Sequence, residues 1–263
     1  MIKINEELCI GCGMCKEDCI AHNIEILDKK AVVKGKCMQC GHCVAICPQK
    51  AVSIPEYDME DVESYDQDTF SLSPVQFLHA IKFRRSIRKF KQDKISKEVL
   101  EEILQAGRYT ATAVNTQAVH YAVVQDGLDE LKPMVWAGWL KVADELPKER
   151  AAFAKSIYGF YDKWMKNKAD DRLFFQAPVF LVIATDNSFD DGLAAANIEM
   201  MAVAKGLGVL YNGYAMRSLK NSKEAVKWLG LEGKSITGCM LLGYPDITYK
   251  RTAPRKKADI LWK

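Results

Sequence analysis

The chain has 263 residues, of which 49% are hydrophobic and 27% charged, and its formal net charge is +3. It is long enough to bury a sizeable core and to form one or two domains. No apolar run approaches the roughly 18 residues of a membrane span, and the first residues lack the apolar stretch of a signal peptide. The composition therefore indicates a soluble globular protein without a membrane partner, with the cytoplasm as its expected location.

Charge and cysteine divide the chain into two parts. Residues 1–73 carry seven Lys, no Arg and thirteen acidic residues, a charge of −6 that leaves +9 for the remainder. Eight of the nine Cys precede residue 48, and only Cys239 follows. In a reducing compartment such a cluster predicts metal binding rather than disulfides. We expect the two parts to have different partners.

The N-terminal cysteines form an internal repeat. The run CIGCGMCKEDC, from Cys9 to Cys19, aligns at every cysteine with CMQCGHCVAIC, from Cys37 to Cys47, with an offset of 28 residues. A short strand-like alternation follows each run at the same offset. Each half is too small to bury much core, so we expect an inorganic group to stabilise it.

The spacing C-x-x-C-x-x-C lets one tight loop hold three corners of a 4Fe-4S cluster, and in the bacterial ferredoxin pattern the fourth cysteine of each run serves the other cluster. This pattern assigns Cys9, Cys12, Cys15 and Cys47 to one 4Fe-4S cluster and Cys37, Cys40, Cys43 and Cys19 to a second. Structural zinc, which also uses C-x-x-C pairs, and a disulfide scaffold are the alternatives. By resemblance, residues 1 to about 54 look like a two-cluster bacterial ferredoxin domain. The first run departs from the pattern in having Ile20, not proline, after its last cysteine.

An acidic segment follows this domain. Between Pro55 and Phe70 lie seven acidic residues and no basic ones, which is typical of a solvated connector. We therefore expect an iron–sulfur domain over residues 1–54, an acidic connector over 55–72 and a second domain over 73–263.

Helix and strand patterns mix in the second domain. Ser73, Pro74 and Gln76 form a helix start, and Ser96 caps the next helix. The periodicity then predicts strands over 119–124, 179–184, 208–214 and 237–243, and helices over 136–168, 192–205 and 225–229. These elements indicate a mixed α+β fold in which helices cover a sheet.

A basic run opens this domain. The segment KFRRSIRKFK, from Lys82 to Lys91, has six positive charges in ten residues. A solvated face or a nucleic-acid patch is the usual explanation, but the acidic first part would repel a polyanion and no nucleic-acid motif accompanies the run. Arg84 and Arg88 lie on one side of either a helix or a strand, and two guanidiniums suit a single phosphate group.

Residues from about 74 to the end resemble the nitroreductase family of flavin mononucleotide (FMN) enzymes. The resemblance lies in four motifs that follow the family's order over about 180 residues. They are R-x-S-x-R at Arg84, Arg85, Ser86, Ile87 and Arg88; N-x-Q at Asn115, Thr116 and Gln117; G-L-G at Gly206, Leu207 and Gly208, before a strand that ends at Asn212 and Gly213; and G-Y-P at Gly243, Tyr244 and Pro245, before a basic tail with Arg251 and Arg255. Ala118 and Val119 stand where the family often has Pro-Trp, so the substrate side departs from the family pattern.

The resemblance implies an α+β nitroreductase-like domain that forms an intertwined homodimer with FMN at the interface. It implies that the backbone N–H of Gly213 faces flavin N5 as the catalytic contact. The implied cofactor-binding residues are Arg84, Arg85, Ser86, Arg88, Asn115, Gln117, Asn212, Gly213, Arg251 and Arg255. Simpler interpretations stay open, since Asn115 could cap a helix end, Gly213 could be a strand bulge and the last two arginines could be plain surface charge.

Joined, the two parts predict an oxidoreductase in which 4Fe-4S clusters pass electrons to FMN and FMN passes hydride to a nitroaromatic, a quinone or a similar electron-poor acceptor. Reduced ferredoxin or NAD(P)H would be the external donor. The alternative is an electron-transfer protein that delivers electrons from the flavin to a protein partner. A zinc-binding nucleic-acid protein is a third hypothesis, and bound zinc without flavin would identify it.

Overall fold

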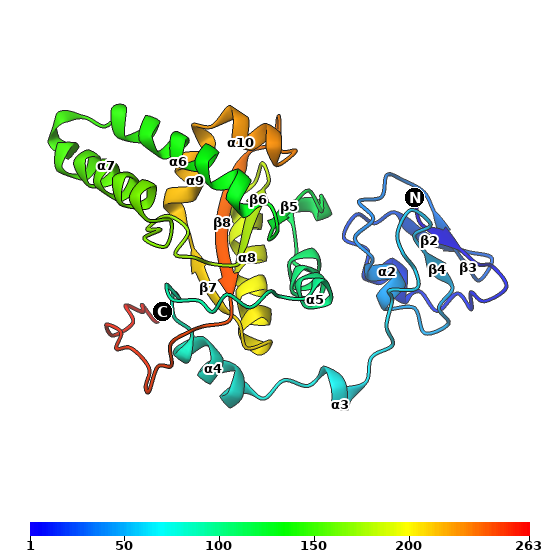
Figure 1. Ribbon diagram of the computed structural model, residues 1–263. Helices are drawn as coiled ribbons and strands as arrows, with labels where there is room; N and C mark the ends of the chain where they lie inside the picture. The colour runs from blue at the N-terminus through cyan, green and yellow to red at the C-terminus, as the bar shows by residue number, and fades with distance from the viewer. The chain divides into compact units, whose positions relative to one another are not determined.

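The computed structural model describes residues 1–263 of the chain. They form two compact units, which we call unit 1 (residues 1–71 and 112–116) and unit 2 (residues 72–111 and 117–263). Unit 1 is drawn mainly in blue in Figure 1, and unit 2 runs from cyan to red. None of the helices combines the length and apolar character that crossing a bilayer requires.

Unit 1 is built from very short elements. Two strand pairs, β1 with β4 and β2 with β3, are both antiparallel. The elements are β1 (Lys3–Ile4), α1 (Met14–Glu17), β2 (Ile24–Leu27), β3 (Lys30–Val33), α2 (His42–Ala45), β4 (Val52–Ser53), α3 (Gln67–Phe70) and the 3-10 turn η1 (Ala113–Asn115).

The cysteine repeat is visible in this fold. Helices α1 and α2 begin 28 residues apart, the offset of the two cysteine runs, and each follows a glycine in the left-handed region, Gly13 (φ 84°) and Gly41 (φ 80°). Strands β2 and β4 also begin 28 residues apart. The two halves therefore repeat in structure as well as in sequence.

The acidic segment is less independent than a solvated connector would be. Unit 1 extends to Ser71, and Tyr57 and Met59 pack against its core because they are apolar side chains between the charged ones. Asp66 then caps the short helix α3 by accepting a hydrogen bond from the backbone N–H of Asp68.

Unit 2 contains a four-stranded antiparallel sheet in the order β5-β6-β8-β7. Its strands are β5 (His120–Val124), β6 (Val179–Ala184), β7 (Gly208–Tyr211) and β8 (Ile236–Gly243). All six residues of β6 are buried, and they alternate between two apolar clusters. Phe180 and Val182 belong to the cluster that includes α6 and α9, whereas Leu181 and Ile183 belong to the cluster that includes α5 and α8. The sheet is therefore covered by helices on both faces, as the sequence predicted (Figure 1).

The helices of unit 2 largely follow the expected order. Ser73 caps α4 and Ser96 caps α5, each with its side-chain oxygen accepting a backbone N–H three residues on. The pattern over 136–168 is interrupted, because residues 145–150 separate two helices that pack together. The helices are α4 (Pro74–Phe83), α5 (Lys97–Arg108), α6 (Leu128–Asp144), the 3-10 turn η2 (Lys148–Arg150), α7 (Ala151–Lys166), α8 (Ser188–Ala204), α9 (Gly213–Lys220) and α10 (Lys223–Trp228).

Candidate functional site

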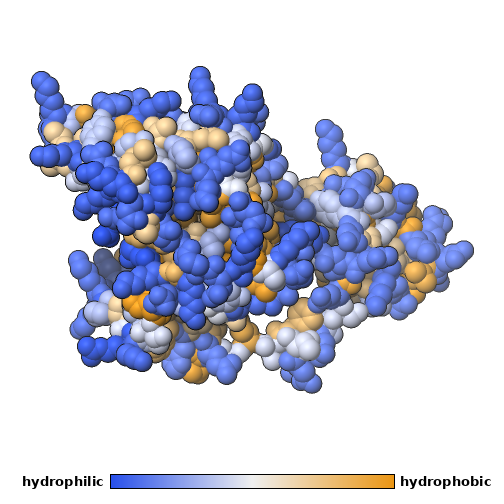
Figure 2. Space-filling model, in the orientation of Figure 1, coloured by the Kyte–Doolittle hydropathy of each residue, from blue (hydrophilic) through white to orange (hydrophobic).

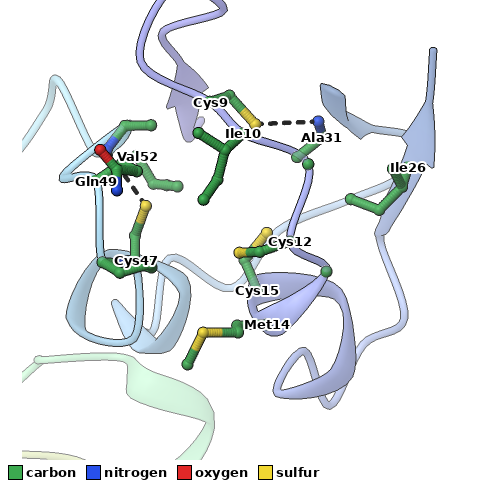
Figure 3. Close-up of a pocket in the computed structure, with 14 residues that line it drawn as sticks. Cys9, Ile10, Cys12, Met14, Cys15, Ile26, Ala31, Cys47, Gln49 and Val52 are labelled. Carbon is green, nitrogen blue, oxygen red and sulfur yellow. Dashed lines mark hydrogen bonds between the residues drawn. The ribbon is translucent and has the colours of Figure 1, made fainter. Parts of the chain in front are cut away.

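Two cavities in unit 1 are lined by cysteines. The first, which opens to solvent, is lined by Cys9, Cys12, Cys15 and Cys47 (Figure 3). The second is lined by Cys19, Cys37, Cys40 and Cys43. These are the two sets of four that the sequence pattern assigned to separate clusters, so the fold brings each set together from both halves of the repeat.

Backbone amides face several of the sulfur atoms. The N–H of Ala31 donates to Cys9 Sγ at 3.4 Å, and that of Ala51 donates to Cys47 Sγ at 3.3 Å. In the second set, the N–H of Gln39 donates to Cys37 Sγ at 3.3 Å. Such amides stabilise negative charge on cysteine sulfur, which is how proteins support iron–sulfur clusters.

The thiols are costly to ionise without a cation. Burial, followed by the neighbouring Cys37 and Cys40, raises the pKa of Cys43 to about 11. Burial and then Cys12 also raise the pKa of Cys15. A cationic group bound between the thiolates would offset this mutual repulsion.

The geometry of the donors fits a polynuclear group. All nine cysteines are free of disulfides. Eight of them line the two cavities in sets of four. Four thiols around a cavity match the ligand set of a 4Fe-4S cluster, which fills more space than one zinc ion.

In unit 2, the basic run lies beside strand β7. Ser86 forms a parallel bridge with Val209, and the N–H of Ile87 donates to the carbonyl of Val209 at 3.0 Å. Gly208 allows this approach, because a Cβ atom there would lie 2.5 Å from Ile87 Cγ1. The R-x-S-x-R segment is thus fixed alongside the strand that leads to Gly213.

The G-Y-P turn lies next to the same segment. The N–H of Lys91 donates to the carbonyl of Tyr244 at 2.8 Å, and the N–H of Asp246 donates to the carbonyl of Lys89 at 2.9 Å. Gly243 is packed against Phe90, where a Cβ atom would come within 2.8 Å of the ring. Three of the four motifs therefore meet around β7 and the end of β8.

Gly213 lies at the start of a helix, not at the end of a strand. Strand β7 stops at Tyr211, and Gly213 is the first residue of α9, so the expected strand over 208–214 was too long. The cause is Asn212, whose Oδ1 accepts the N–H of Ala215 at 3.0 Å and caps the helix. Around Gly213 the space is open, since nothing lies within 4 Å of an added Cβ. A helix N-terminus presents free N–H groups to a ligand.

Asn212 has a different place from the one the resemblance implied. Its side chain is buried, and its Nδ2 donates to the carbonyl of Leu173 at 2.7 Å while Oδ1 caps α9. Both ends of the amide are therefore engaged inside the protein. The side chain orients Gly213 rather than offering hydrogen bonds to a cofactor.

The arginines of the basic run differ in their surroundings. Arg84 Nη1 forms a partly buried ion pair with Glu199 Oε1 at 3.1 Å. Arg85 turns its Nη1 back to the carbonyls of Lys82 and Arg84, and its Nη2 is buried without a hydrogen-bond partner. Arg88 is exposed and makes no ion pair.

The basic tail makes no side-chain contact with the basic run. Arg251 and Arg255 are exposed, and the one hydrogen bond of the Arg255 side chain is to the carbonyl of its neighbour Pro254 at 3.4 Å. No hydrogen bond or ion pair joins either arginine to the basic run. The segment from residue 247 onward has no helix or strand to fix it.

The N-x-Q element is divided between the units. Asn115 belongs to unit 1, where its Nδ2 donates to the carbonyl of Gln39 at 2.9 Å. Gln117 belongs to unit 2 and is exposed. Both have positive φ angles, 54° and 50°, which non-glycine residues adopt rarely and which mark a special loop conformation.

The aromatic segment is mostly core. Trp136 and Trp139 of α6 and Trp164 of α7 are buried, and Trp136 stacks on Trp164 with ring centroids 5.3 Å apart. Tyr214, directly after Gly213, stacks on Trp139 at 5.1 Å while remaining partly exposed. The three tryptophans are therefore part of the core, whereas Tyr214 presents a partly exposed aromatic ring beside Gly213.

Sequence reasoning missed Glu199. It lies in α8 among alanine, isoleucine and methionine, and it is 7% exposed. A lone acid on an apolar helix face is a detectable signal, because a buried carboxylate needs a partner. That partner, Arg84, is 115 residues away in sequence.

The residues of unit 2 fit a flavin phosphate and ring. Arg85 Nη2 is an orphaned buried donor within the basic run, as an anion site would leave when it lacks its anion. Gly213 lies at the N-terminus of α9 in the same unit, with open space where a Cβ atom would be. A buried guanidinium N–H and an uncrowded helix N-terminus are features that a phosphate and a flat ring can use.

Comparisons with known proteins agree with this geometry. The family model described as "Nitroreductase family" matches residues 81–244, and that described as "4Fe-4S dicluster domain" matches residues 1–48. A nitroreductase from Desulfitobacterium hafniense, whose crystal structure has bound FMN, is 25% identical and has a TM-score of 0.57, covering 72% of this chain and 98% of that one.

Curated relatives match one part each. A putative NADH dehydrogenase/NAD(P)H nitroreductase from Methanothermobacter thermautotrophicus is 25% identical over 151 residues, 54% of this chain and 63% of the relative. A subunit of the ion-translocating oxidoreductase complex of Methanosarcina acetivorans is 47% identical over 47 residues, 18% of each chain. The chain thus spans less than two thirds of the length of these relatives. Because the nitroreductase model covers more than half of its residues, the chain belongs to the nitroreductase family, and it carries a 4Fe-4S dicluster domain at its N-terminus.

Proposed function

We propose that the protein is an FMN-dependent oxidoreductase that takes electrons through two 4Fe-4S clusters in unit 1 and transfers hydride from FMN in unit 2 to an electron-poor small molecule. The observation that carries the proposal is the pair of cavities, each lined by four cysteines drawn from both halves of the repeat. A nitroaromatic or a quinone is the proposed acceptor class. The FMN-bound structural relative supports the flavin.

The cysteines have a defined role in this proposal. Cys9, Cys12, Cys15 and Cys47 hold one cluster, and the set of Cys19, Cys37, Cys40 and Cys43 holds the second. Backbone amides at the sulfurs of Cys9, Cys37 and Cys47 stabilise the negative charge of the thiolates. The repeat gives the two clusters similar surroundings.

The roles in unit 2 follow from position. Arg84, Arg85 and Arg88 would bind the phosphate, and Ser86 lies among them on the segment bridged to β7. Asn212 holds the start of α9, where the backbone N–H of Gly213 would contact the flavin ring. Bound FMN accepts electrons singly from an iron–sulfur cluster and delivers two of them as hydride. Asn115 and Gln117 are proposed contacts to the ring or ribityl chain, and Arg251 and Arg255 to the phosphate, on the resemblance alone.

We further propose a homodimer. Helix α4 has no buried residue, although Val75, Phe77, Leu78 and Ile81 are apolar. Hydrophobic atoms are visible at the surface where Figure 1 places α4 (Figure 2). An exposed apolar surface of this kind marks an interaction site, and a second copy gives a self-complementary interface. Replacing Phe77 with Glu should yield monomers in light scattering, whereas Lys82→Glu on the same helix should not.

The decisive experiment is anaerobic purification followed by analysis of iron, sulfide, flavin and zinc. We expect about eight iron atoms and one FMN per chain. Colourless protein with zinc and no flavin would overturn the proposal. Anaerobic reduction with NAD(P)H in one sample and reduced ferredoxin in another then identifies the donor, and turnover with a nitroaromatic or quinone tests the acceptor.

A second function has its own supporting observation. Ile10 and Ile20 are 61% and 76% exposed beside cysteines of the first run. Exposed apolar side chains at an electron-transfer centre suit the docking of a protein. In this alternative, a flavo-iron–sulfur protein delivers electrons to a protein partner and has no small-molecule acceptor. Reduced protein that is oxidised by a partner protein, yet not by nitroaromatics or quinones, would favour it.

A further inference from the structure

One ion pair inside unit 2 joins the basic run to the helix layer. Arg84 follows the last residue of α4, and Glu199 lies on α8. Their side chains are 26% and 10% exposed, and Arg84 Nη1 lies 3.1 Å from Glu199 Oε1. The pair is therefore largely removed from water.

Strand β7 supplies a third member of this cluster. The hydroxyl of Tyr211 donates to the carbonyl of Ala195 at 3.0 Å, one turn before Glu199 on α8. Burial raises the pKa of Tyr211, and the charge and hydrogen bonding of Glu199 raise it further. The carboxylate of Glu199 is thus paired with an arginine at the end of α4, and Tyr211 of β7 lies close enough for its pKa to respond to that charge.

Stability alone does not account for this arrangement. A buried ion pair gains little over apolar side chains of the same size, because removing two charges from water offsets their attraction. The effect of the Arg84–Glu199 pair is to orient the side chain of Arg84. The backbone beside Arg84 is fixed to β7 through Ser86 and Ile87, and the side chain is fixed by Glu199. A guanidinium has five N–H donors, so binding one carboxylate oxygen leaves others for a second anion.

The other arginines of the run lack such a support. Arg85 folds back on backbone carbonyls, and Arg88 is exposed without an acidic partner. Arg84 is therefore the one arginine of the run whose direction an acidic side chain sets. Orienting a donor before its ligand arrives reduces the entropy lost on binding.

We propose that Glu199 is a positioning residue that orients the guanidinium of Arg84 toward the phosphate of FMN and so selects flavins that carry a phosphate. The inference rests on the proposed function and deepens it. Glu199 touches Arg84 and not the flavin, and it contributes no net attraction because its charge cancels one positive charge. Its contribution is the direction of the N–H groups of Arg84.

The test compares two flavins that differ only in the phosphate. The full chain is freed of flavin and titrated with FMN and with riboflavin, with the quenching of flavin fluorescence as the readout. Glu199→Gln keeps the shape of the side chain and removes its charge. We expect its Kd for FMN to rise about tenfold while the Kd for riboflavin changes less than about twofold.

A matched control comes from the same helix layer. Lys205, which follows the last residue of α8, forms an ion pair with Glu102 of α5, and neither residue belongs to the basic run. Glu102→Gln removes that pair and should leave both flavin affinities unchanged. In an Arg84→Ala background, Glu199→Gln should no longer alter the ratio of the two Kd values, because the side chain that it orients is absent.

Two results would overturn the inference. Equal weakening of FMN and riboflavin would mean that Glu199 only supports the fold, and tighter FMN binding would mean that Glu199 competes with the phosphate for Arg84. A wild-type protein that binds neither flavin would instead overturn the proposed function. The two failures are therefore distinguishable.

Discussion

In unit 2 every residue of β6 is buried between two apolar layers, whereas unit 1 has strands of two to four residues, and three of its nine buried apolar residues are cysteines. Unit 2 can be stabilised by burial of apolar surface alone. Unit 1 has little such surface, and small domains of this kind depend on disulfides or metals. We therefore expect removal of the metal to destabilise unit 1 and mutation of the apolar core to destabilise unit 2.

Loss of a cluster ligand should have the largest effect. Cys12→Ser and Cys40→Ser occupy matching positions of the repeat, and each should lower iron by about half or more and expose unit 1 to protease, because binding of the metal group is coupled to folding. All five tryptophans lie in unit 2. The thermal unfolding of unit 2, followed by tryptophan fluorescence, should therefore be the same in these variants as in the wild type. Cys239→Ala, in the buried strand β8, is the control and should leave iron unchanged. Unaltered iron in both serine variants would contradict the assignment.

A core mutation should affect unit 2 alone. Trp136 is fully buried and contacts Trp139, Tyr161 and Trp164. Trp136→Ala should lower the free energy of unfolding of unit 2 by about 3–5 kcal/mol, owing to lost contacts and a cavity. Denaturant unfolding measures the change, and iron content should be unaffected. Trp262→Ala, in the exposed tail, should change stability by less than about 0.5 kcal/mol.

Arginine substitutions in the basic run should lower the flavin content and leave the iron content unchanged. Arg88→Ala should lower flavin retention through gel filtration about tenfold, because a charge-assisted hydrogen bond to phosphate is lost, and should leave iron intact. Arg84→Ala should do the same and also destabilise unit 2, since it leaves Glu199 buried without its partner. Lys91→Ala, from the same run, should retain both cofactors. If all three variants behaved alike, the run would act as one basic patch.

The smallest effect is expected from the partly buried carboxyl group of Asp191 in unit 2. Asp191 of α8 faces Gly238, its Oδ1 is buried without a hydrogen bond, and burial raises its pKa from 3.8 to about 6. Between these pH values the folded state retains a proton that the unfolded chain releases, so stability falls as pH rises from about 4 to 6 and stays reduced above. Asp191→Asn should therefore stabilise unit 2 by about 1–2 kcal/mol at pH 8, after allowing for partial exposure, and should lose this advantage near pH 3.5.

The matched control is Asp162→Asn on the exposed face of α7. Thermal unfolding followed by tryptophan fluorescence across this pH range gives the difference between each variant and the wild type. A difference for Asp191→Asn that did not vary with pH would refute the assignment of the proton to this carboxyl.

Local signals predicted most of the elements. Capping at Ser73 and Ser96 depends on neighbouring residues, and both helices begin where the sequence predicted. The apolar run of β6 needed no partner to be recognised, and its predicted bounds match the structure. Three local predictions were wrong in extent: the helix expected over 136–168 begins at Leu128 and is interrupted by residues 145–150; the strand toward Gly213 ends at Tyr211; and the helix expected over 192–205 begins at Ser188. In the second case, Asn212 is buried as the cap of α9, and its side chain donates to the carbonyl of Leu173. The sequence does not reveal this contact.

By itself, the sequence determined the two cysteine sets, the order of the domains and the position of the basic run, because spacing and motif order are local and chemically specific. Only the tertiary structure decided which of those residues face a site. It turned the side chain of Asn212 inward, left Arg251 and Arg255 in solvent, and placed Glu199 on Arg84 across 115 residues of chain. The physical reason is burial: a charge or amide enclosed by the fold must find its partner wherever packing brings one, and no local pattern records that choice.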